Sequence, residues 1–191
     1  MDGGGTVLDD DAMTGWALAA QQGDREAAAA FIRATTGHLR RLLSYLADAG
    51  QVEDLVQETY LRAFAALPRY GQRSPARLWL LSIARRVAAD QVRSNQRSPR
   101  RTGGDWEYEL DRRRSVADHS GAAELRFAIA ALDPERREAF VLTRVMGLSY
   151  EEAAQACACP VGTIRSRVYR ARADLLDSLS ERQDPASGIC Q

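Results

Sequence analysis

Apolar residues along this chain recur at intervals of three and four positions, and hardly any segment alternates apolar and polar residues. The first spacing places apolar side chains on one face of a helix, whereas alternation would indicate a strand. The pattern therefore predicts an all-α protein. The expected helices cover residues 12–22, 24–50, 52–67 and 76–94, then 120–132, 133–146, a short segment after Ser149, and 160–179.

Residues that favour helix starts lie at several of these boundaries. Asp24 precedes the second helix as an N-cap, and Asp133 precedes a helix whose first residue is Pro134. Ser149 and Glu152 have the spacing of a capping box, in which each side chain bonds to the backbone N–H of the other residue. These signals predict where three of the helices begin.

The periodicity stops between residues 95 and 118, where Pro99, Gly103 and Gly104 accompany blocks of mixed charge. Such a composition favours a flexible linker. We therefore expect two small helical domains joined by a flexible linker. The predicted divisions are an acidic tail at 1–11, a first domain at 12–94, the linker at 95–119, a second domain at 120–182 and a C-terminal tail at 183–191.

The composition is typical of a soluble globular protein, with 45% apolar and 27% charged residues. No apolar run approaches the roughly 20 residues that a membrane helix needs. The N-terminus is acidic, whereas a secretory signal would be basic and then apolar. We therefore expect a cytoplasmic protein with no membrane partner.

The formal net charge is zero, but the charges are unevenly distributed along the chain. All 26 basic residues are arginine. Residues 1–11 contain four acids and no base, whereas residues 12–94 contain eleven arginines and seven acids, a net charge of +4. The chain thus has a basic body behind an acidic tail, and the zero total does not exclude nucleic acid as a partner.

The sequence contains no pattern typical of an active site. It lacks a Gly-rich phosphate loop, an HExxH motif and a Ser-centred elbow, and its two histidines are His38 and His119. Cys157, Cys159 and Cys190 would need further ligands to bind zinc, so we interpret the first two as buried or half-buried thiols and the last as exposed. We expect no catalytic residue, cofactor or metal.

Residues 148–176 have the layout of a helix-turn-helix: a short capped helix, a tight turn and a longer basic helix. The stripe of the last helix that must face the core consists of Ile164, Val168, Ala171 and Leu175. Arginines and small hydroxyl groups on the opposite side suit a DNA groove, because Arg can bind guanine or grip phosphate. A solvated structural face would carry interleaved acids, but residues 160–173 contain four arginines and no acid. The predicted DNA contacts are Thr163, Arg165, Ser166, Arg167, Tyr169 and Arg170.

The helix at 76–94 shows a weaker form of the same design. Its apolar stripe consists of Leu80, Ile83, Ala84 and Val87, and the opposite face is polar and basic. The loop at 70–75 combines polar residues with an aromatic, a composition that can hold an unstacked base. The spacing fits an ordinary exposed helix equally well, and Trp79 is assigned to the core. The candidate DNA contacts are Arg73, Ser74, Ser82, Arg85, Arg86 and Arg93.

The helix at 52–67 has an outer face that DNA binding does not explain. Its inward positions are Val56, Thr59, Tyr60, Ala63 and Leu67. The outward positions are acidic and include one leucine, with no arginine among them to neutralise the charge. Such a surface would repel DNA and suits a protein partner, although a solvated acidic face fits equally well. The candidate protein-binding residues are Asp54, Gln57, Glu58 and Leu61.

These segments resemble the sigma-70 superfamily, specifically its small extracytoplasmic-function (ECF) sigma factors, and among those the actinobacterial members. DLVQET at 54–59, followed by LRAF at 61–64, is similar to region 2.2 of that family. ARLWLLSIARR at 76–86 is similar to regions 2.3 and 2.4. LSYEEAA at 148–154, followed by CPVGTIRSR at 159–167, is similar to region 4.2. The motifs occur in the family's order over residues 12–94 and 120–180.

The resemblance implies a factor that directs promoter-specific transcription initiation without catalysis of its own. Region 2.2 would dock on the β′ coiled coil of core RNA polymerase, and the β subunit belongs to the same implied partner. Regions 2.3 and 2.4 would open and read the −10 promoter element, and region 4.2 would read the −35 element. In addition to promoter DNA, many family members bind an anti-sigma protein.

Two other functions fit parts of the sequence. A stand-alone helix-turn-helix repressor or activator would bind a duplex operator tightly by itself, usually as a dimer. It would have no need of the acidic face on residues 52–67. A helical adaptor that binds only protein would have no need of the arginine-rich helices.

Overall fold

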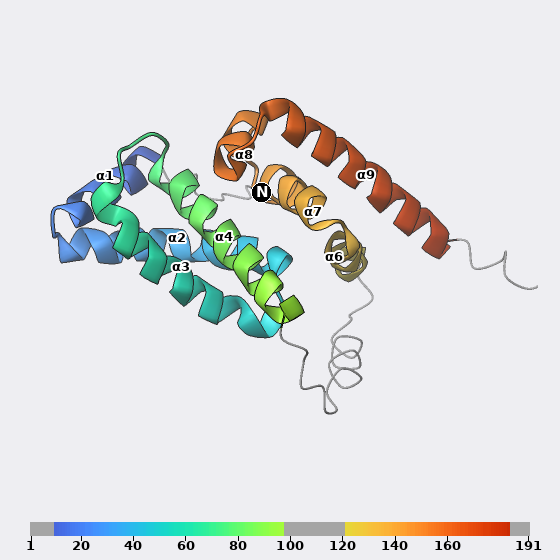
Figure 1. The fold of residues 1–191 in the computed structure, drawn as a ribbon, viewed down its shortest axis with the longest axis horizontal. Coiled ribbons are helices and arrows are strands. Elements are labelled where there is room, and N and C mark those ends of the chain that lie inside the picture. The colour runs from blue at the N-terminus through green and yellow to red at the C-terminus, as the bar shows by residue number, and fades with distance from the viewer. Residues whose placement is uncertain (1–9, 98–120, 184–191) are drawn as a thin grey trace, which may run out of the picture.

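The computed structural model describes residues 10–97 and 121–183, and every regular element within these ranges is helical (Figure 1). The all-α prediction is confirmed for this part of the chain. Residues 1–9 of the acidic tail, most of the expected linker at 95–119 and residues 184–191 of the C-terminal tail lie outside the described residues, whereas residues 10 and 11 already belong to the first helix.

The first half of the chain folds into a bundle in which two long helices each contact all of the others. Its helices are α1 (Asp10–Gln21), α2 (Arg25–Leu46), α3 (Val52–Ala66) and α4 (Ala76–Arg97), and the two that contact all of the others are α2 and α4. Short 3-10 turns at Ala49–Gln51 and Leu67–Arg69 precede and follow α3. α2 ends before the expected boundary near Gly50, because the backbone becomes extended at Ala47 (φ −138°, ψ 171°).

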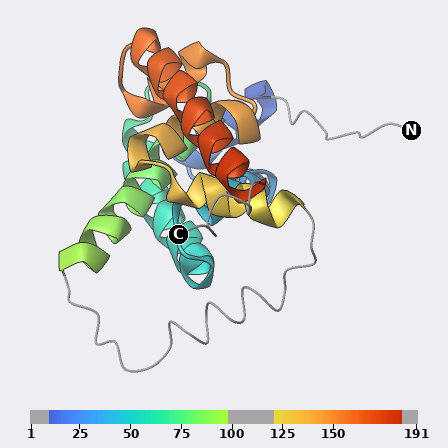
Figure 2. The same ribbon diagram turned by 90° about the vertical axis from the view of Figure 1, so that its right-hand side faces the viewer.

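The second half places a long C-terminal helix across three shorter ones. α9 (Val161–Gln183) contacts α6 (Gly121–Ala131), α7 (Pro134–Phe140) and α8 (Tyr150–Cys157). The helix expected at 133–146 is α7 continued by a π-helical turn at Val141–Val145. Figure 2 shows α9 crossing the outer side of this half.

The predicted helix starts are confirmed by their hydrogen bonds. The Asp24 carboxylate accepts from the backbone N–H of Glu26 and Ala27 at 2.9 and 3.0 Å. Asp133 caps α7 in the same way. Ser149 and Glu152 form the complete capping box, with N···O distances of 3.1 and 2.7 Å. Each cap satisfies backbone donors that a helix N-terminus leaves without a partner.

The two halves of the chain pack against each other instead of standing apart. Their buried apolar residues form one continuous core. α4 contacts α8, and α2 contacts α6 and α7. Figure 1 shows α4 lying between its own bundle and the second half. α4 is therefore covered on two sides, which decides what its polar residues can contact.

Candidate nucleic-acid interface

The predicted core stripe of α9 is buried, as the sequence analysis expects. All four of its members, Ile164, Val168, Ala171 and Leu175, have buried side chains. The opposite face is open: Arg165, Ser166, Tyr169 and Arg170 are exposed, and Thr163 is half-buried. The Tyr169 side chain is 76% exposed, which is unusual for a large aromatic. This face offers two guanidinium groups, hydroxyl groups and a ring to a ligand.

The turn between α8 and α9 holds this face in place. Ala158 adopts the left-handed conformation (φ 52°), so the chain reverses immediately after α8. The backbone N–H of Cys159 then donates to the carbonyl of Ala154 at 3.1 Å. The carbonyl of Pro160 accepts from the N–H of Thr163 at 2.9 Å and starts α9. The turn is thus a helix C-cap followed directly by a new helix start.

Arg167 differs from the other arginines predicted on this face. Its side chain is 22% exposed, whereas that of Arg165 is 66% exposed. The Arg167 guanidinium pairs with the carboxylate of Glu135 in the first turn of α7. Arg165 lies 3.8 Å from Glu151, a distance too long for a hydrogen bond. Arg165 therefore remains available to a ligand, and Arg167 already has a protein partner.

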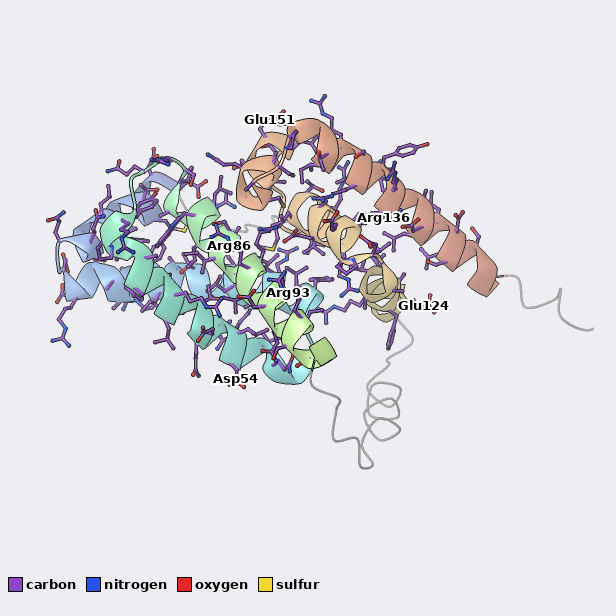
Figure 3. All side chains as sticks on the ribbon, in the orientation of Figure 1. Asp54, Arg86, Arg93, Glu124, Arg136 and Glu151 are labelled. Atoms are coloured by element: carbon purple, nitrogen blue, oxygen red, sulfur yellow. The ribbon has the colours of Figure 1, made fainter. Side chains whose placement is uncertain are left out.

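Two arginines predicted on α4 are exposed and one predicted serine is not. Arg86 and Arg93 lie along the outer side of α4 (Figure 3). The apolar stripe Leu80, Ile83, Ala84 and Val87 is buried as predicted. Ser82 was expected on the outer face, but it is 8% exposed and donates to the carbonyl of Trp79 at 2.7 Å. The expectation that Ser82 is exposed is wrong: its side chain is buried and bonded within α4, where Arg86 Nη2 also lies 3.4 Å from its hydroxyl oxygen.

Arg85 forms a two-point ion pair with the second half of the chain. Its Nε donates to Glu138 Oε1 at 2.5 Å, and its Nη2 donates to Oε2 at 3.2 Å. The two side chains are only 21% and 14% exposed. Paired Arg–carboxylate hydrogen bonds of this kind are strong and directional. The Arg85 guanidinium, which was predicted to contact DNA, is thus already paired with the Glu138 carboxylate of α7.

The N-terminal part of α4 makes similar contacts with α8. Arg77 donates twice to the carboxylate of Asp10, at 2.7 and 2.9 Å, and lies 3.5 Å from Glu152 of α8. The Gln155 side chain donates to the backbone carbonyl of Arg73 at 3.1 Å, while the Arg73 side chain stays exposed. Sequence reasoning did not single out Arg77. Its partners lie 67 and 75 residues away, so no local signal identifies the contact.

The outer face of α3 is largely as expected. Asp54, Gln57 and Leu61 are exposed, and the Leu61 side chain is 69% exposed. Asp54 is visible at the edge of the molecule in Figure 3. The inward positions Val56, Thr59, Ala63 and Leu67 are buried, and Tyr60 is half-buried.

The acidic charge of α3 is partly neutralised, contrary to expectation. Glu58 is half-buried and accepts a hydrogen bond from Arg62 Nε at 2.7 Å, while Arg62 Nη1 donates to Asp90 of α4 at 2.7 Å. Arg62 and Arg93 together lower the pKa of the Asp90 carboxyl. The i,i+4 spacing of Glu58 and Arg62 was readable in the sequence. Asp54 and Leu61 are therefore the stronger features of this face.

The cysteines agree with the interpretation as small thiols. Cys157 is buried and Cys159 half-buried, and both are free. Burial raises the pKa of the Cys157 thiol to about 12, so it stays protonated near neutral pH. Cys190 lies outside the described residues. Among the described side chains, no group of three His, Cys, Asp or Glu residues is placed to hold a metal ion.

None of the described helices is both long enough and apolar enough to cross a membrane.

Two family models match the chain, one in each half. Residues 29–98 match the model described as sigma-70 region 2, and residues 122–175 match the model described as sigma-70, region 4. The first range contains α4, and the second contains α9 up to residue 175.

The chain is also similar to curated proteins over most of its length. It is 48% identical over 172 residues to the ECF RNA polymerase sigma factor SigC of Mycobacterium tuberculosis, covering 90% of this chain and 93% of that protein. It is 30% identical over 164 residues to the ECF RNA polymerase sigma-E factor of Escherichia coli, covering 80% and 86%.

Two solved structures share the fold across both halves. CnrH, solved in complex with the cytosolic domain of CnrY, is 27% identical, with a TM-score of 0.69 over 90% of this chain and 99% of that one. The sigma factor RpoE of Bartonella quintana, solved in complex with the anti-sigma factor NepR, is 29% identical, with a TM-score of 0.62 over 78% and 94%. These neighbours confirm the two-domain helical fold.

Proposed function

The chain belongs to the ECF sigma factors of the sigma-70 family, and from this premise we propose how its two halves divide the promoter between them. Members of this family are initiation factors and not enzymes, so the chain acts in promoter recognition by RNA polymerase. We assign core-polymerase binding and the −10 element to residues 12–94. The −35 element is assigned to residues 120–182.

The exposed face of α9 is the observation that carries the proposal. Arg165, Ser166, Tyr169 and Arg170 stand opposite a buried stripe on a helix that follows a tight turn. An α-helix fits the major groove, and Arg forks can bind guanine bidentately or grip phosphate. In our assignment these residues read the −35 element together with Thr163.

The −10 element is assigned to α4 and the loop before it. Arg73, Arg86 and Arg93 are exposed in the described structure, and Ser74 is half-buried. Ser82 is buried, and Arg85 is paired with Glu138 of the second half of the chain. Use of Arg85 in this face therefore requires α7 to leave α4. The described arrangement is a closed form, and the form that reads the −10 element is open.

The outer face of α3 is assigned to the polymerase. An exposed leucine beside acidic side chains suits a basic protein partner and repels DNA. The family resemblance supplies the β′ coiled coil as that partner. We place the protein in the cytoplasm, where its polymerase partner works. An anti-sigma partner is a further part of this proposal, supported by the similar sigma factor RpoE, which was solved in complex with the anti-sigma factor NepR.

Reconstituted transcription tests the proposed function against the repressor alternative. The purified chain should co-purify with core RNA polymerase and, on fragments of its own genome, give run-off transcripts from a defined set of promoters. Without polymerase it should bind the same duplexes weakly at physiological salt, because the −10 element must be opened before it can be read. Tight duplex binding by the chain alone, with no capture of polymerase, would support a stand-alone repressor or activator instead.

A further inference from the structure

Two ion pairs of opposite polarity join α7 to α9. Arg167 of α9 pairs with Glu135 of α7, and Arg136 of α7 donates from Nη1 to Asp174 Oδ2 of α9 at 2.7 Å. Arg136 lies between the two helices in Figure 3. We propose that Arg167 is a positioning residue, which sets the pose of α9 through Glu135 instead of contacting DNA. This inference rests on the proposed reading of the −35 element by α9.

The burial of Arg167 separates it from its neighbours. It lies two positions from Arg165 on the same helix, yet its side chain has about one third of the exposure, 22% against 66%. Its Nη1 is 4.0 Å from the sulfur of Cys159 in the turn before α9. The guanidinium thus lies between the first turn of α7 and the turn of the helix-turn-helix. A side chain that reached bases would extend from the open face of α9.

The order of charges along the two helices selects one register. Glu135 and Arg136 are adjacent on α7 and have opposite charge. Arg167 and Asp174 are seven residues apart, which is nearly two helical turns, so they lie on the same side of α9. A roll or slide of α9 that brought Arg167 towards Arg136 would place like charges together. The two ion pairs therefore favour the observed position of α9 over positions reached by a small roll or slide.

The apolar stripe and the ion pairs have different effects on α9. Burial of Ile164, Val168 and Leu175 attaches α9 to the rest of the domain and tolerates small rotations. The ion pairs are directional and partly exposed, so each contributes little to total stability. Base contacts depend on donor–acceptor distances near 2.7–3.2 Å. A small change in the pose of α9 would therefore weaken all contacts with the −35 element together.

A charge-swap experiment on the full chain tests the positioning role. The probe is a duplex that carries the −35 element of a promoter identified by run-off transcription. Arg167→Glu and Glu135→Arg should each weaken binding by about fivefold, the upper end for a partly exposed pair. The double variant restores the pair with reversed polarity, so its affinity should return to within about twofold of wild type. Its dependence on salt concentration should equal that of wild type.

Two control variants separate the possible causes. Arg172 is exposed on α9 and has no ion pair with Glu135 in the structure. Arg172→Glu combined with Glu135→Arg has the same net charge as the swap and should stay weak. Arg165→Ala should weaken binding about 5- to 150-fold at guanine positions, the range for a bidentate base contact. No substitution at Glu151, the acid nearest to Arg165, should restore the affinity that Arg165→Ala loses.

Specific results would overturn the proposal. If the double variant stays as weak as Arg167→Glu and its slope of log affinity against log salt is shallower by about 0.9, Arg167 contacts a phosphate. If Arg167→Glu does not fold, Arg167→Gln and Glu135→Gln replace it, and additive effects on affinity would contradict coupling. If Arg165→Ala and Arg170→Ala leave binding to the −35 duplex unchanged, the assignment of α9 to the −35 element fails. That outcome would contradict the proposed function, whereas the two outcomes above contradict only the positioning role of Arg167.

Discussion

At the scale of single residues, Ala158, in the turn between α8 and α9, has an unfavourable backbone conformation. Its φ of 52° places the backbone of this residue in the left-handed region, which glycine occupies without steric cost but a residue with a side chain does not. Ala158→Gly should therefore raise the free energy of unfolding by up to about 1 kcal/mol and Tm by about 2–4 °C. Thermal unfolding followed by circular dichroism measures both. Ala153→Gly, inside α8, is the control and should lower stability. Equal destabilisation by both changes would contradict the strain at Ala158.

At the scale of elements, the outer face of α3 separates a sigma factor from other DNA-binding proteins. Leu61→Arg removes an exposed apolar side chain and adds a positive charge facing the expected basic partner. Because the position is exposed, stability should stay within about 0.5 kcal/mol of wild type. Co-purification with core polymerase should nevertheless be lost.

The matched control for this prediction is Leu176→Arg. Leu176 is 65% exposed, close to the 69% of Leu61, but lies on α9 in the other half of the chain. Leu176→Arg should leave co-purification with core polymerase unchanged. Glu58→Arg would place an arginine beside Arg62 and disturb its contact with Asp90, so that change would alter more than the outer face of α3. A folded Leu61→Arg protein that assembles normally with polymerase would remove α3 from the docking role.

At the scale of the whole molecule, the second half of the chain contacts α4 through α8 and through the Arg85–Glu138 pair. Glu138→Arg should replace the ion pair with Arg85 by a repulsion between two poorly exposed guanidinium groups. Since the pair is only partly buried, we expect a loss of about 1–2 kcal/mol for the closed form, less than for a fully buried pair. Binding of a single-stranded −10 oligonucleotide to the full chain should rise about 5- to 30-fold. Small-angle scattering should show a larger radius of gyration.

Two further variants check this interpretation. Glu124→Arg changes an exposed acid on α6 and should leave both measurements as in wild type. Glu138→Arg combined with Arg85→Glu restores the pair with reversed polarity and should return the radius of gyration to the wild-type value. An unchanged radius and oligonucleotide affinity in Glu138→Arg would show that the ion pair does not hold the halves together.

The sequence by itself determined the helices, their starts and the face of α9 that points inward. These features depend on residues within one or two turns of each other, such as Asp24 and the N–H groups of α2, or Ser149 and Glu152. The stripe of α9 repeats every three or four residues, so helical geometry alone predicts its burial. The Glu58–Arg62 pair belongs to the same class, since its i,i+4 spacing was readable in advance.

Only the tertiary structure decided which polar side chains are free. Ser82 is buried although its position on α4 predicted exposure, and Arg85 pairs with a carboxylate 53 residues away. Arg167 has the same side-chain chemistry as Arg165 and belongs to the same basic helix, but it lies on another side of that helix and is paired with a residue 32 positions away. Helical periodicity gives the direction of a side chain and not what lies opposite it. That information depends on how helices far apart in the sequence pack, both within the second half and between the two halves, which no local pattern encodes.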